Sequence, residues 1–180
     1  PNPLLEENLK ALKKMVREKN ADLGIAFDGD GDRVIFVNEK GKAVPADFIS
    51  ALMIKLILEK NQGEKILYDI RSSNIVREVI KEGGGRPIVS RIGHSFVKEK
   101  MRKENIIFAG EFSGHYYHKA HYFCEAPFFV IFTLLKELSR AKKSLSELME
   151  PFKKYFHSGE INFKVSDKEK TIKELVKRFK

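Results

Sequence analysis

The spacing of apolar residues along this chain changes between the helical period and short continuous runs that are typical of buried strands. Helical spacing predicts helices over residues 1–20, 45–61, 73–85, 95–105 and 126–143, and an amphipathic segment over 144–156. Short apolar runs predict strands over residues 23–27, 34–37, 65–70, 87–92 and 106–112. The aromatic residues between 113 and 125 are expected to form a loop, and the tail from 159 to 180 one strand and one helix.

Predicted strands and helices alternate from residue 45 onward. This alternation is typical of right-handed strand–helix–strand units, which place their strands side by side in a parallel sheet. The sequence therefore predicts an α/β fold with a mixed, mainly parallel sheet and helices on both of its faces.

The stretch between the first two predicted strands reads Asp-Gly-Asp-Gly-Asp-Arg and sets Asp28, Asp30 and Asp32 at alternate positions. In an extended segment these carboxylates would point the same way and repel one another unless a cation lay among them. A tight hairpin turn rich in Asp and Gly is the alternative. A calcium EF-hand is excluded, because Arg33 stands where that loop needs glycine and the flanks are strand-like. The Arg33 guanidinium beside a bound cation would suit a phosphate.

A second polar stretch, Gly-Glu-Phe-Ser-Gly-His, follows a predicted strand and sets Glu111, Ser113 and His115 at alternate positions. Ligands bind to α/β sheets at the carboxyl ends of the strands. Glu and Ser can pair with sugar hydroxyl groups, and His can move a proton near neutral pH. A solvated hairpin is the alternative. His115, His118 and His121 also have a spacing that could bind zinc, which we consider the weaker interpretation because carboxylate or cysteine support is missing.

Two further loops follow predicted strands. One contains Asp69 and Arg71, and the other contains Arg91, Gly93 and His94. Each alone is typical of an ordinary surface, but both would lie at the same edge of the sheet as the Glu111 stretch.

Composition limits the class of protein. The 180 residues carry a formal net charge of +9, but the basic residues are dispersed, so we expect no nucleic-acid partner. A single cysteine, Cys124, excludes an intramolecular disulfide, and no apolar run approaches the roughly 18 residues of a membrane span. No signal-peptide pattern is present either. We therefore expect a cytoplasmic protein with no membrane partner.

Three motifs, GIAFDGDGDR, IGHSFVKEKM and GEFSGHYY, together resemble the α-D-phosphohexomutase superfamily, which comprises phosphomannomutase/phosphoglucomutase and phosphoglucosamine mutase enzymes. Such enzymes are isomerases of carbohydrate metabolism and phosphoproteins. They move a phosphoryl group between the 1- and 6-positions of a hexose phosphate through an enzyme phosphoserine and a hexose bisphosphate.

The resemblance implies a role for each matching residue. Asp28, Asp30 and Asp32 would bind Mg²⁺. The catalytic residues would be His115 as general base, with Arg71 as the alternative base, and Arg33 near the transferable phosphate. The substrate-binding residues would be Glu111, Ser113, His115, Gly93, His94 and Arg71.

The resemblance also implies a domain organisation. Residues 1–43 would be the end of a second domain, 44–155 a complete third domain, and 156–180 the start of a fourth, α+β domain. We expect a piece of a longer enzyme whose partners are its own missing domains and which is inactive alone, because the phosphoserine loop is not in this sequence. The alternative is a non-catalytic metal- and phosphosugar-binding module. One departure is the stretch Cys-Glu-Ala-Pro-Phe-Phe over 124–129, where many relatives have an Asp-Asp-Gly type of stretch.

Overall fold

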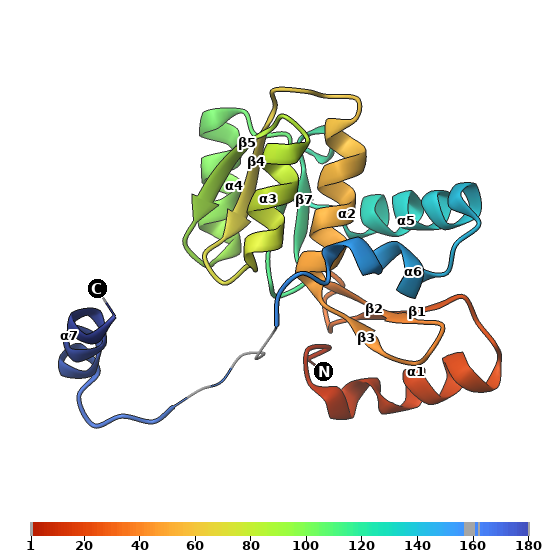
Figure 1. Ribbon diagram of the computed structural model, residues 1–180, viewed down its shortest axis with the longest axis horizontal. Coiled ribbons are helices and arrows are strands. Elements are labelled where there is room, and N and C mark those ends of the chain that lie inside the picture. Colours follow the sequence, from red (N-terminus) through yellow and green to blue (C-terminus); the bar gives the residue numbers. More distant parts are fainter. Residues whose placement is uncertain (1, 157–160, 162, 180) are drawn as a thin grey trace.

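The computed structural model describes residues 2–156, 161 and 163–179 (Figure 1). The helices are α1 (Glu6–Glu18), α2 (Ala46–Leu58), α3 (Asn74–Glu82), α4 (His94–Glu104), α5 (Pro127–Ala141), α6 (Leu145–Met149) and α7 (Lys168–Arg178), with short 3-10 turns η1 (Lys119–His121) and η2 (Glu150–Phe152). The strands are β1 (Leu23–Phe27), β2 (Val34–Asn38), β3 (Ala43–Val44), β4 (Lys65–Asp69), β5 (Arg86–Ser90), β6 (Phe108–Gly110), β7 (Tyr116–His118) and β8 (Cys124–Glu125).

The first strands form a small antiparallel sheet in the order β1-β2-β3. Phe27 pairs with Val34, so residues 28–33 form the tip of the β1–β2 hairpin. Helix α1 covers this sheet with Leu9 and Val16, which are both buried. Gly24 allows this close packing, because a Cβ atom there would lie 2.7 Å from the Val16 side chain.

The larger sheet has the strand order β5-β4-β6-β7-β8. Strand β4 pairs in parallel with β5 and β6, whereas β7 pairs antiparallel with β6 and β8. The predicted mixed α/β fold is confirmed. The prediction of a plain loop between 113 and 125 is wrong, because β7 and β8 lie there. Tyr116 and Tyr117 are both fully buried on opposite faces of β7, so this strand lacks the polar and apolar alternation that marks a half-exposed strand.

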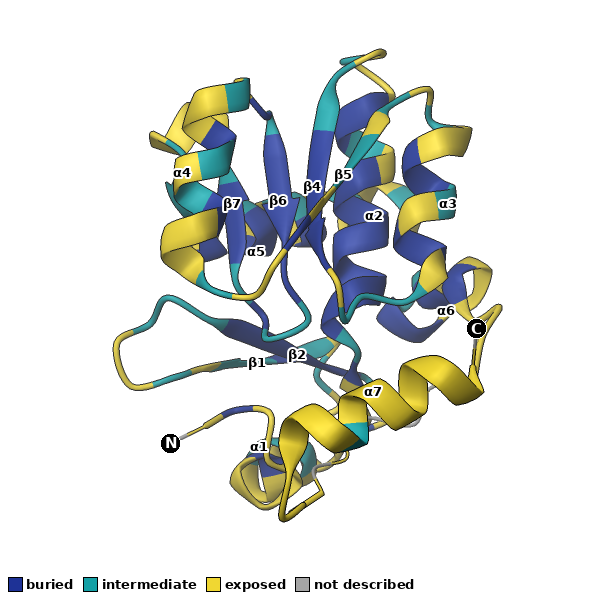
Figure 2. Cartoon of the chain, turned by 90° about the vertical axis from the view of Figure 1, so that its left-hand side faces the viewer, coloured by how far each residue is buried: buried dark blue, intermediate teal, exposed yellow. Residues whose placement is uncertain are grey.

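Helices cover both faces of the larger sheet, as Figure 2 shows for α4 on one side and α2 and α3 on the other. Ile66, Phe108 and Tyr116 point into the main core shared with α2, α3 and α5. Leu67, Ala109 and Tyr117 point the other way, into a second cluster with α4. This alternation follows from the two-residue period of a strand.

The small sheet and the larger sheet share one hydrophobic core. Buried residues of β2 belong to the same cluster as α2 and β6. Helix α6, which begins with a capping box formed by Ser144 and Glu147, is held to the small sheet by Ser146, whose backbone N–H donates to the Glu39 carboxylate at 3.1 Å. The shared core and this contact therefore join the small sheet to the rest of the molecule.

The tail differs from its prediction in part. The predicted helix is confirmed as α7, which follows the N-cap Asp167, and none of its residues is buried. The expected strand is not found at Ile161 or at residues 163–166, and residues 157–160 and 162 lie outside the described residues. A strand needs a neighbouring strand to satisfy its backbone, and no sheet contains the described part of this stretch.

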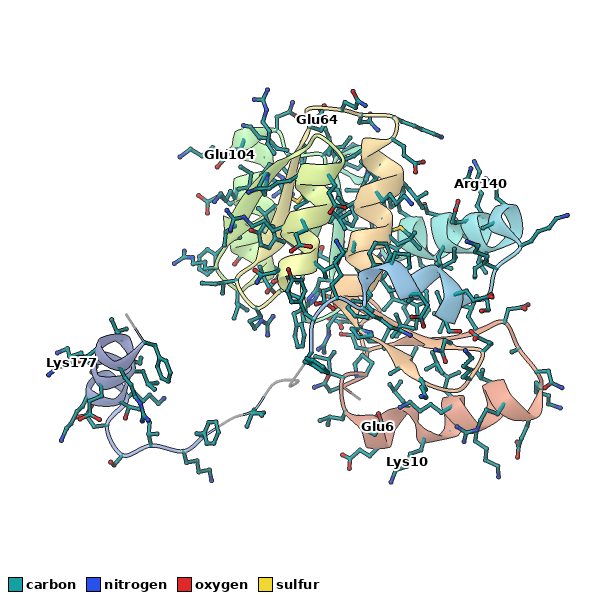
Figure 3. The ribbon with its side chains drawn as sticks, in the orientation of Figure 1. Glu6, Lys10, Glu64, Glu104, Arg140 and Lys177 are labelled. Atoms are coloured by element: carbon teal, nitrogen blue, oxygen red, sulfur yellow. The ribbon has the colours of Figure 1, made fainter. Side chains whose placement is uncertain are left out.

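Charged side chains are spread over the surface. Figure 3 labels examples from separate elements, among them Lys10 on α1, Arg140 on α5 and Lys177 on α7. Within the part of the chain that the structure describes, none of the helices has the length and apolar character needed to cross a membrane.

Candidate functional site

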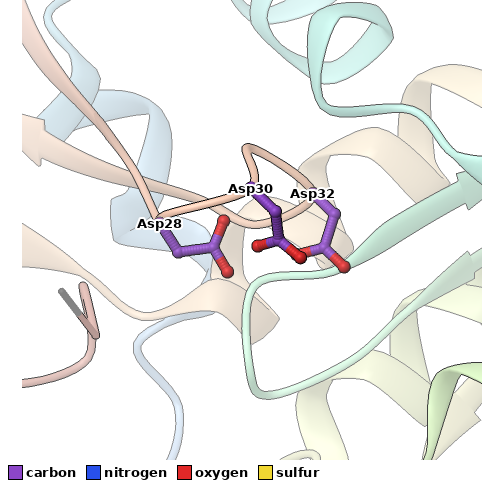
Figure 4. Close-up of side chains that lie close together, drawn as sticks. All are labelled: Asp28, Asp30 and Asp32. Carbon is purple, nitrogen blue, oxygen red and sulfur yellow. The ribbon is translucent and has the colours of Figure 1, made fainter.

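The three aspartates lie at the tip of the β1–β2 hairpin (Figure 4). Asp28, Asp30 and Asp32 each offer an oxygen atom within 4.8 Å of the others. Their backbone is a turn rather than an extended segment, and Gly31 adopts a φ of +76° there. The hairpin and the carboxylate cluster, which the sequence left as alternatives, therefore occur together, although the connection over residues 28–33 is a longer loop and not a tight turn. The sequence analysis attributed the clustering of the carboxylates to side-chain alternation along an extended segment, and that explanation is wrong.

Arg33 and the turn backbone hold Asp28. Asp28 Oδ1 accepts hydrogen bonds from the backbone N–H groups of Gly31 and Arg33, both at 3.1 Å, and Oδ2 accepts from Arg33 Nε at 2.5 Å. Burial of Asp28 opposes ionisation, but these hydrogen bonds and the Arg33 charge lower its pKa to about 2. Asp28 is therefore an anion at neutral pH.

Asp30 and Asp32 have fewer partners. Asp30 is exposed, and Asp32 Oδ2 lies 3.3 Å from His115 Nε2. Burial raises the pKa of Asp32 above its ordinary value, His115 opposes this shift, and the neighbouring Asp28 and Asp30 add to it. A set of close carboxylate oxygens fits a hard divalent cation such as Mg²⁺, which would relieve this repulsion. The donor set is thus suited to the predicted metal.

The second polar stretch forms a tight turn between β6 and β7. The Glu111 N–H donates to the His115 carbonyl at 2.9 Å, and the Gly114 N–H donates to the Glu111 carbonyl at 3.1 Å. Gly114 has a φ of +89°, a conformation that glycine adopts without strain. The Val34 N–H donates to the Gly114 carbonyl at 3.0 Å, so the aspartate hairpin and this turn are joined through the backbone.

His115 lies between the two loops. Its Nε2 faces Asp32, and its Nδ1 lies 2.8 Å from Ser113 Oγ and 3.4 Å from Glu111 Oε2. Its side chain is 17% exposed, whereas the Glu111 side chain is only 2% exposed. The structure therefore brings Glu111, Ser113 and His115 together, with Glu111 innermost.

Tyr117 is a residue of this site that the sequence analysis missed. Its hydroxyl group donates to Glu111 Oε2 at 2.7 Å. Burial raises the pKa of Tyr117, and the Glu111 charge adds to that shift, so the hydroxyl group keeps its proton. Glu111, Ser113 and His115 stand at every second position, and continuing this spacing to the next position would have selected Tyr117.

Asp69 links the loop after β4 to the same turn. This carboxylate is fully buried and accepts hydrogen bonds from the Arg71 N–H at 2.7 Å, Arg71 Nη2 at 3.0 Å and the Phe112 N–H at 3.0 Å. The Arg71 guanidinium also lies 5.6 Å from the centre of the Phe112 ring. Asp69 therefore fixes Arg71 beside the Glu111 turn.

Gly93 and His94 take different positions. The Gly93 N–H donates to Glu111 Oε1 at 3.4 Å, and Gly93 begins α4 with a φ of +126°. The His94 side chain is 60% exposed, and its Nδ1 lies 3.6 Å from Glu125 Oε1, which also accepts from Lys98 Nζ at 2.7 Å. Gly93 contacts the Glu111 carboxylate directly, whereas His94 faces Glu125 of the 124–129 stretch.

The histidine spacing that could have suggested zinc does not form a metal site. Among the described residues, the group whose geometry could hold a metal is the aspartate set, and His118 and His121 are not in it. His118 instead accepts a hydrogen bond from the Ala120 N–H at 3.1 Å and stacks on Phe129, with ring centres 4.2 Å apart.

Comparisons with known proteins agree on one family. A family model described as phosphoglucomutase/phosphomannomutase, alpha/beta/alpha domain III, matches residues 45–155, and the model for domain II matches residues 1–41. A phosphomannomutase of Methanocaldococcus jannaschii is 42% identical over 180 residues, which cover 100% of this chain and 40% of that protein. A phosphomannomutase of Escherichia coli is 39% identical over 181 residues, covering 99% of this chain and 40% of that protein.

A solved structure supports the same relationship. The crystal structure of a phosphoglucomutase/phosphomannomutase family protein from Burkholderia thailandensis matches with a TM-score of 0.81 and 32% identity, covering 87% of this chain and 34% of that one. The chain spans about 40% of the length of the curated relatives that it matches.

Proposed function

Since this chain belongs to the phosphoglucomutase/phosphomannomutase family, we propose that it carries part of the active site of a phosphohexomutase, which moves a phosphoryl group between the 1- and 6-positions of a hexose phosphate. The observation that carries this proposal is the 3.3 Å approach of Asp32 Oδ2 to His115 Nε2. This contact supports the proposal that a cation bound by the aspartates would lie beside the polar turn proposed to bind sugar hydroxyl groups.

The domain boundaries form part of the proposal. We assign residues 1–43 to the end of domain II, 44–155 to domain III and 156–180 to the start of a following domain. The family models over 1–41 and 45–155 support the first two assignments.

The aspartates would hold Mg²⁺, which when bound neutralises phosphoryl charge and orients the phosphoryl oxygens. Asp28 is suited to this because the Arg33 hydrogen bond keeps it ionised. Arg33 would add its positive charge near the transferable phosphate, where a guanidinium binds phosphate oxygens well.

His115 would be the general base that takes a proton from the attacking sugar hydroxyl. Its two ring nitrogens face Asp32 on one side and Ser113 on the other, so each can exchange a proton with a neighbouring oxygen. Arg71, the alternative base, is less suited, because a guanidinium stays protonated and Asp69 pairs with it at 3.0 Å. We propose that Arg71 binds substrate instead.

The turn over residues 111–115 would bind the hexose, with Ser113 and His115 at its exposed side and Glu111 beneath them. Gly93 contacts Glu111 and belongs to the same binding surface. His94 would also bind substrate. It lies at the N-terminus of α4, where the helix dipole would stabilise a phosphate group.

The test is a phosphohexomutase assay with glucose 1-phosphate and with mannose 1-phosphate, in the presence of Mg²⁺ and a hexose bisphosphate. The full-length protein should interconvert the 1- and 6-phosphates. The 180-residue chain alone should not, because the proposed phosphoserine belongs to a part of the relatives that this chain does not span. Turnover by the 180-residue chain would overturn the proposed phosphoserine mechanism, and an inactive full-length protein would overturn the proposed function.

A further inference from the structure

Tyr117 is a fully buried tyrosine whose hydroxyl group is directed at the carboxylate proposed to bind the hexose. We propose that Tyr117 is a positioning residue, which fixes Glu111 in the orientation that binds sugar hydroxyl groups. This inference rests on the proposed phosphohexomutase function. Tyr117 is placed beneath Glu111 and acts on the substrate only through it.

The contacts of Glu111 show why it depends on a positioning group. Its side chain is 2% exposed, and a buried carboxylate is costly unless donors surround it. The Tyr117 hydroxyl group donates at 2.7 Å, whereas the Gly93 N–H donates at 3.4 Å and His115 Nδ1 lies at 3.4 Å. The Tyr117 hydroxyl group is the nearest of these three groups, so it has the largest influence on the direction of the carboxylate.

The Tyr117 ring is itself held rigidly. It packs in the cluster beneath α4, against neighbours that include Val97, Met101 and Ala109. Its strand β7 is paired on both sides, with β6 and with β8. A donor on a rigid strand confines a carboxylate to one rotamer more strongly than a donor on a mobile surface side chain would.

The position of the hydrogen bond also connects sugar binding to the proposed base. The oxygen that accepts from Tyr117 is Glu111 Oε2, and the same oxygen faces His115 Nδ1 at 3.4 Å. Loss of the hydroxyl group would therefore let this oxygen turn away from both its Tyr117 and its His115 neighbours. The expected effect is mainly on hexose binding, with a smaller effect on the rate of the bound complex.

The neighbouring Tyr116 provides a matched control. It lies on the same strand, is equally buried, and donates its hydroxyl hydrogen bond to the Ala46 carbonyl at 3.3 Å. That bond lies on the opposite face of the sheet, in the core shared with α2. Tyr116→Phe therefore removes a buried hydroxyl group from β7 without touching Glu111.

The experiment compares Tyr117→Phe with Tyr116→Phe in the full-length protein, by steady-state kinetics with glucose 1-phosphate and by thermal unfolding. Tyr117→Phe should raise KM by roughly tenfold and lower kcat less, because a charged acceptor loses its strongest donor. Tyr116→Phe should leave both constants within about twofold of the wild type. In a Glu111→Ala background, which removes the acceptor of the Tyr117 hydrogen bond, the Tyr117→Phe effect on KM should largely disappear.

The outcomes separate the inference from the function on which it rests. If the wild type is active and Tyr117→Phe has the same KM as Tyr116→Phe, the positioning role is overturned and the proposed function stands. If the wild type is inactive, the positioning role and the proposed function are both overturned.

A second variant covers the case in which Tyr117→Phe does not fold. Replacing Tyr117 by 3-fluorotyrosine retains the ring and changes the donor strength of the hydroxyl group. A changed KM then supports the inference and an unchanged KM overturns it.

Discussion

The backbone N–H of Val34 donates a hydrogen bond to the carbonyl oxygen of Gly114 at 3.0 Å, and so joins the aspartate hairpin to the turn that contains Glu111 and His115. An isolated antiparallel bridge between Arg33 and His115 accompanies this bond. Two loops distant in sequence are thereby held in register by their backbones, and the Asp32 to His115 contact follows from that register. The relative position of the two loops depends on the small residue at 114.

Gly114→Ala should disturb this junction. Gly114 has a φ of +89°, and a Cβ atom there would lie 2.9 Å from Ile35 Cδ1 and 3.1 Å from the Val34 carbonyl oxygen. We expect a loss of about 1 to 3 kcal/mol in the free energy of unfolding, from overpacking and backbone strain together, and a fall in kcat/KM for the full-length enzyme. Chemical denaturation and steady-state kinetics would measure the two effects.

Gly63→Ala is the matched control for that substitution. Gly63 has a φ of +78°, but nothing lies within 4 Å of the position that its Cβ would take. Gly63→Ala should therefore lower the free energy of unfolding through backbone strain alone, without a steric clash, and should leave kcat/KM unchanged. Equal losses of stability in the two variants would mean that the Gly114 contact with the hairpin is unimportant.

Much of this fold could be predicted from the sequence because local signals agree with the tertiary structure. Helix α3, for example, begins after the N-cap Ser73, and its buried residues recur at helical spacing. Strands β7 and β8 could not be predicted, because β7 is buried on both faces and β8 is only two residues long. Strand β7 pairs with β6, and β8 pairs with β7, and the local sequence of each strand does not encode these pairings.

Asp69→Asn tests whether one buried carboxylate fixes the neighbouring binding residues. An Asn side chain has one acceptor oxygen, whereas Asp69 accepts from two groups of Arg71 and from the Phe112 N–H. Because Asp69 is fully buried while the Arg71 side chain is 26% exposed, we expect the weakened hydrogen bonds to cost about 1 to 3 kcal/mol in the free energy of unfolding. Urea unfolding of the wild type and the variant would measure it.

The control is a carboxylate–arginine pair in which the arginine is exposed and the Glu137 side chain is 13% exposed. Arg140 donates two hydrogen bonds to Glu137, at 2.9 and 3.0 Å, but its side chain is 65% exposed. Glu137→Gln should therefore change the free energy of unfolding by less than about 1 kcal/mol. If Asp69→Asn cost no more than Glu137→Gln, Asp69 would have no special role in holding Arg71.

Asp30→Asn tests the cation site. Asp30 is exposed, whereas Asp28 has Arg33 and Asp32 has His115, so the Asp30 charge is available to a cation with the least rearrangement. We expect Asp30→Asn to weaken Mn²⁺ or Mg²⁺ binding by roughly tenfold or more, measured by calorimetry on the folded chain. Asp22→Asn, a substitution at another exposed aspartate of the same segment, should leave the affinity unchanged. Equal affinity in wild type and Asp30→Asn would rule out the proposed ligand.

The candidate site shows where reasoning from sequence alone ends. The residues 28, 30 and 32 and the residues 111, 113 and 115 could be selected by their spacing, because each set lies within one loop. The contact between Asp32 and His115 could not, because it depends on how two sheets pack. Nor could the burial of Glu111 beneath Ser113 and His115, which follows from its contacts with Tyr117 and Gly93.

A pH-dependent contact holds α6 to the small sheet. Glu39 accepts hydrogen bonds from the Ser146 hydroxyl group and from the Ser146 N–H. Burial alone would raise the pKa of Glu39, but these hydrogen bonds outweigh it and lower the pKa below its ordinary value. Exposed Lys40 lies 3.8 Å away and adds less.

Glu39→Gln should therefore destabilise the protein at neutral pH and not in acid. Because the pKa of Glu39 is lowered by folding, its contribution is fully present above the ordinary glutamate pKa of about 4.3 and is lost as the pH falls through the lower folded value. We expect a difference of about 1 to 2 kcal/mol in the free energy of unfolding at pH 7, shrinking steadily below about pH 4. Urea unfolding across this range would show it, with Glu99→Gln at an exposed position of α4 as the control. A difference that stayed constant from pH 7 to acid would mean that the charge of Glu39 does not stabilise this contact.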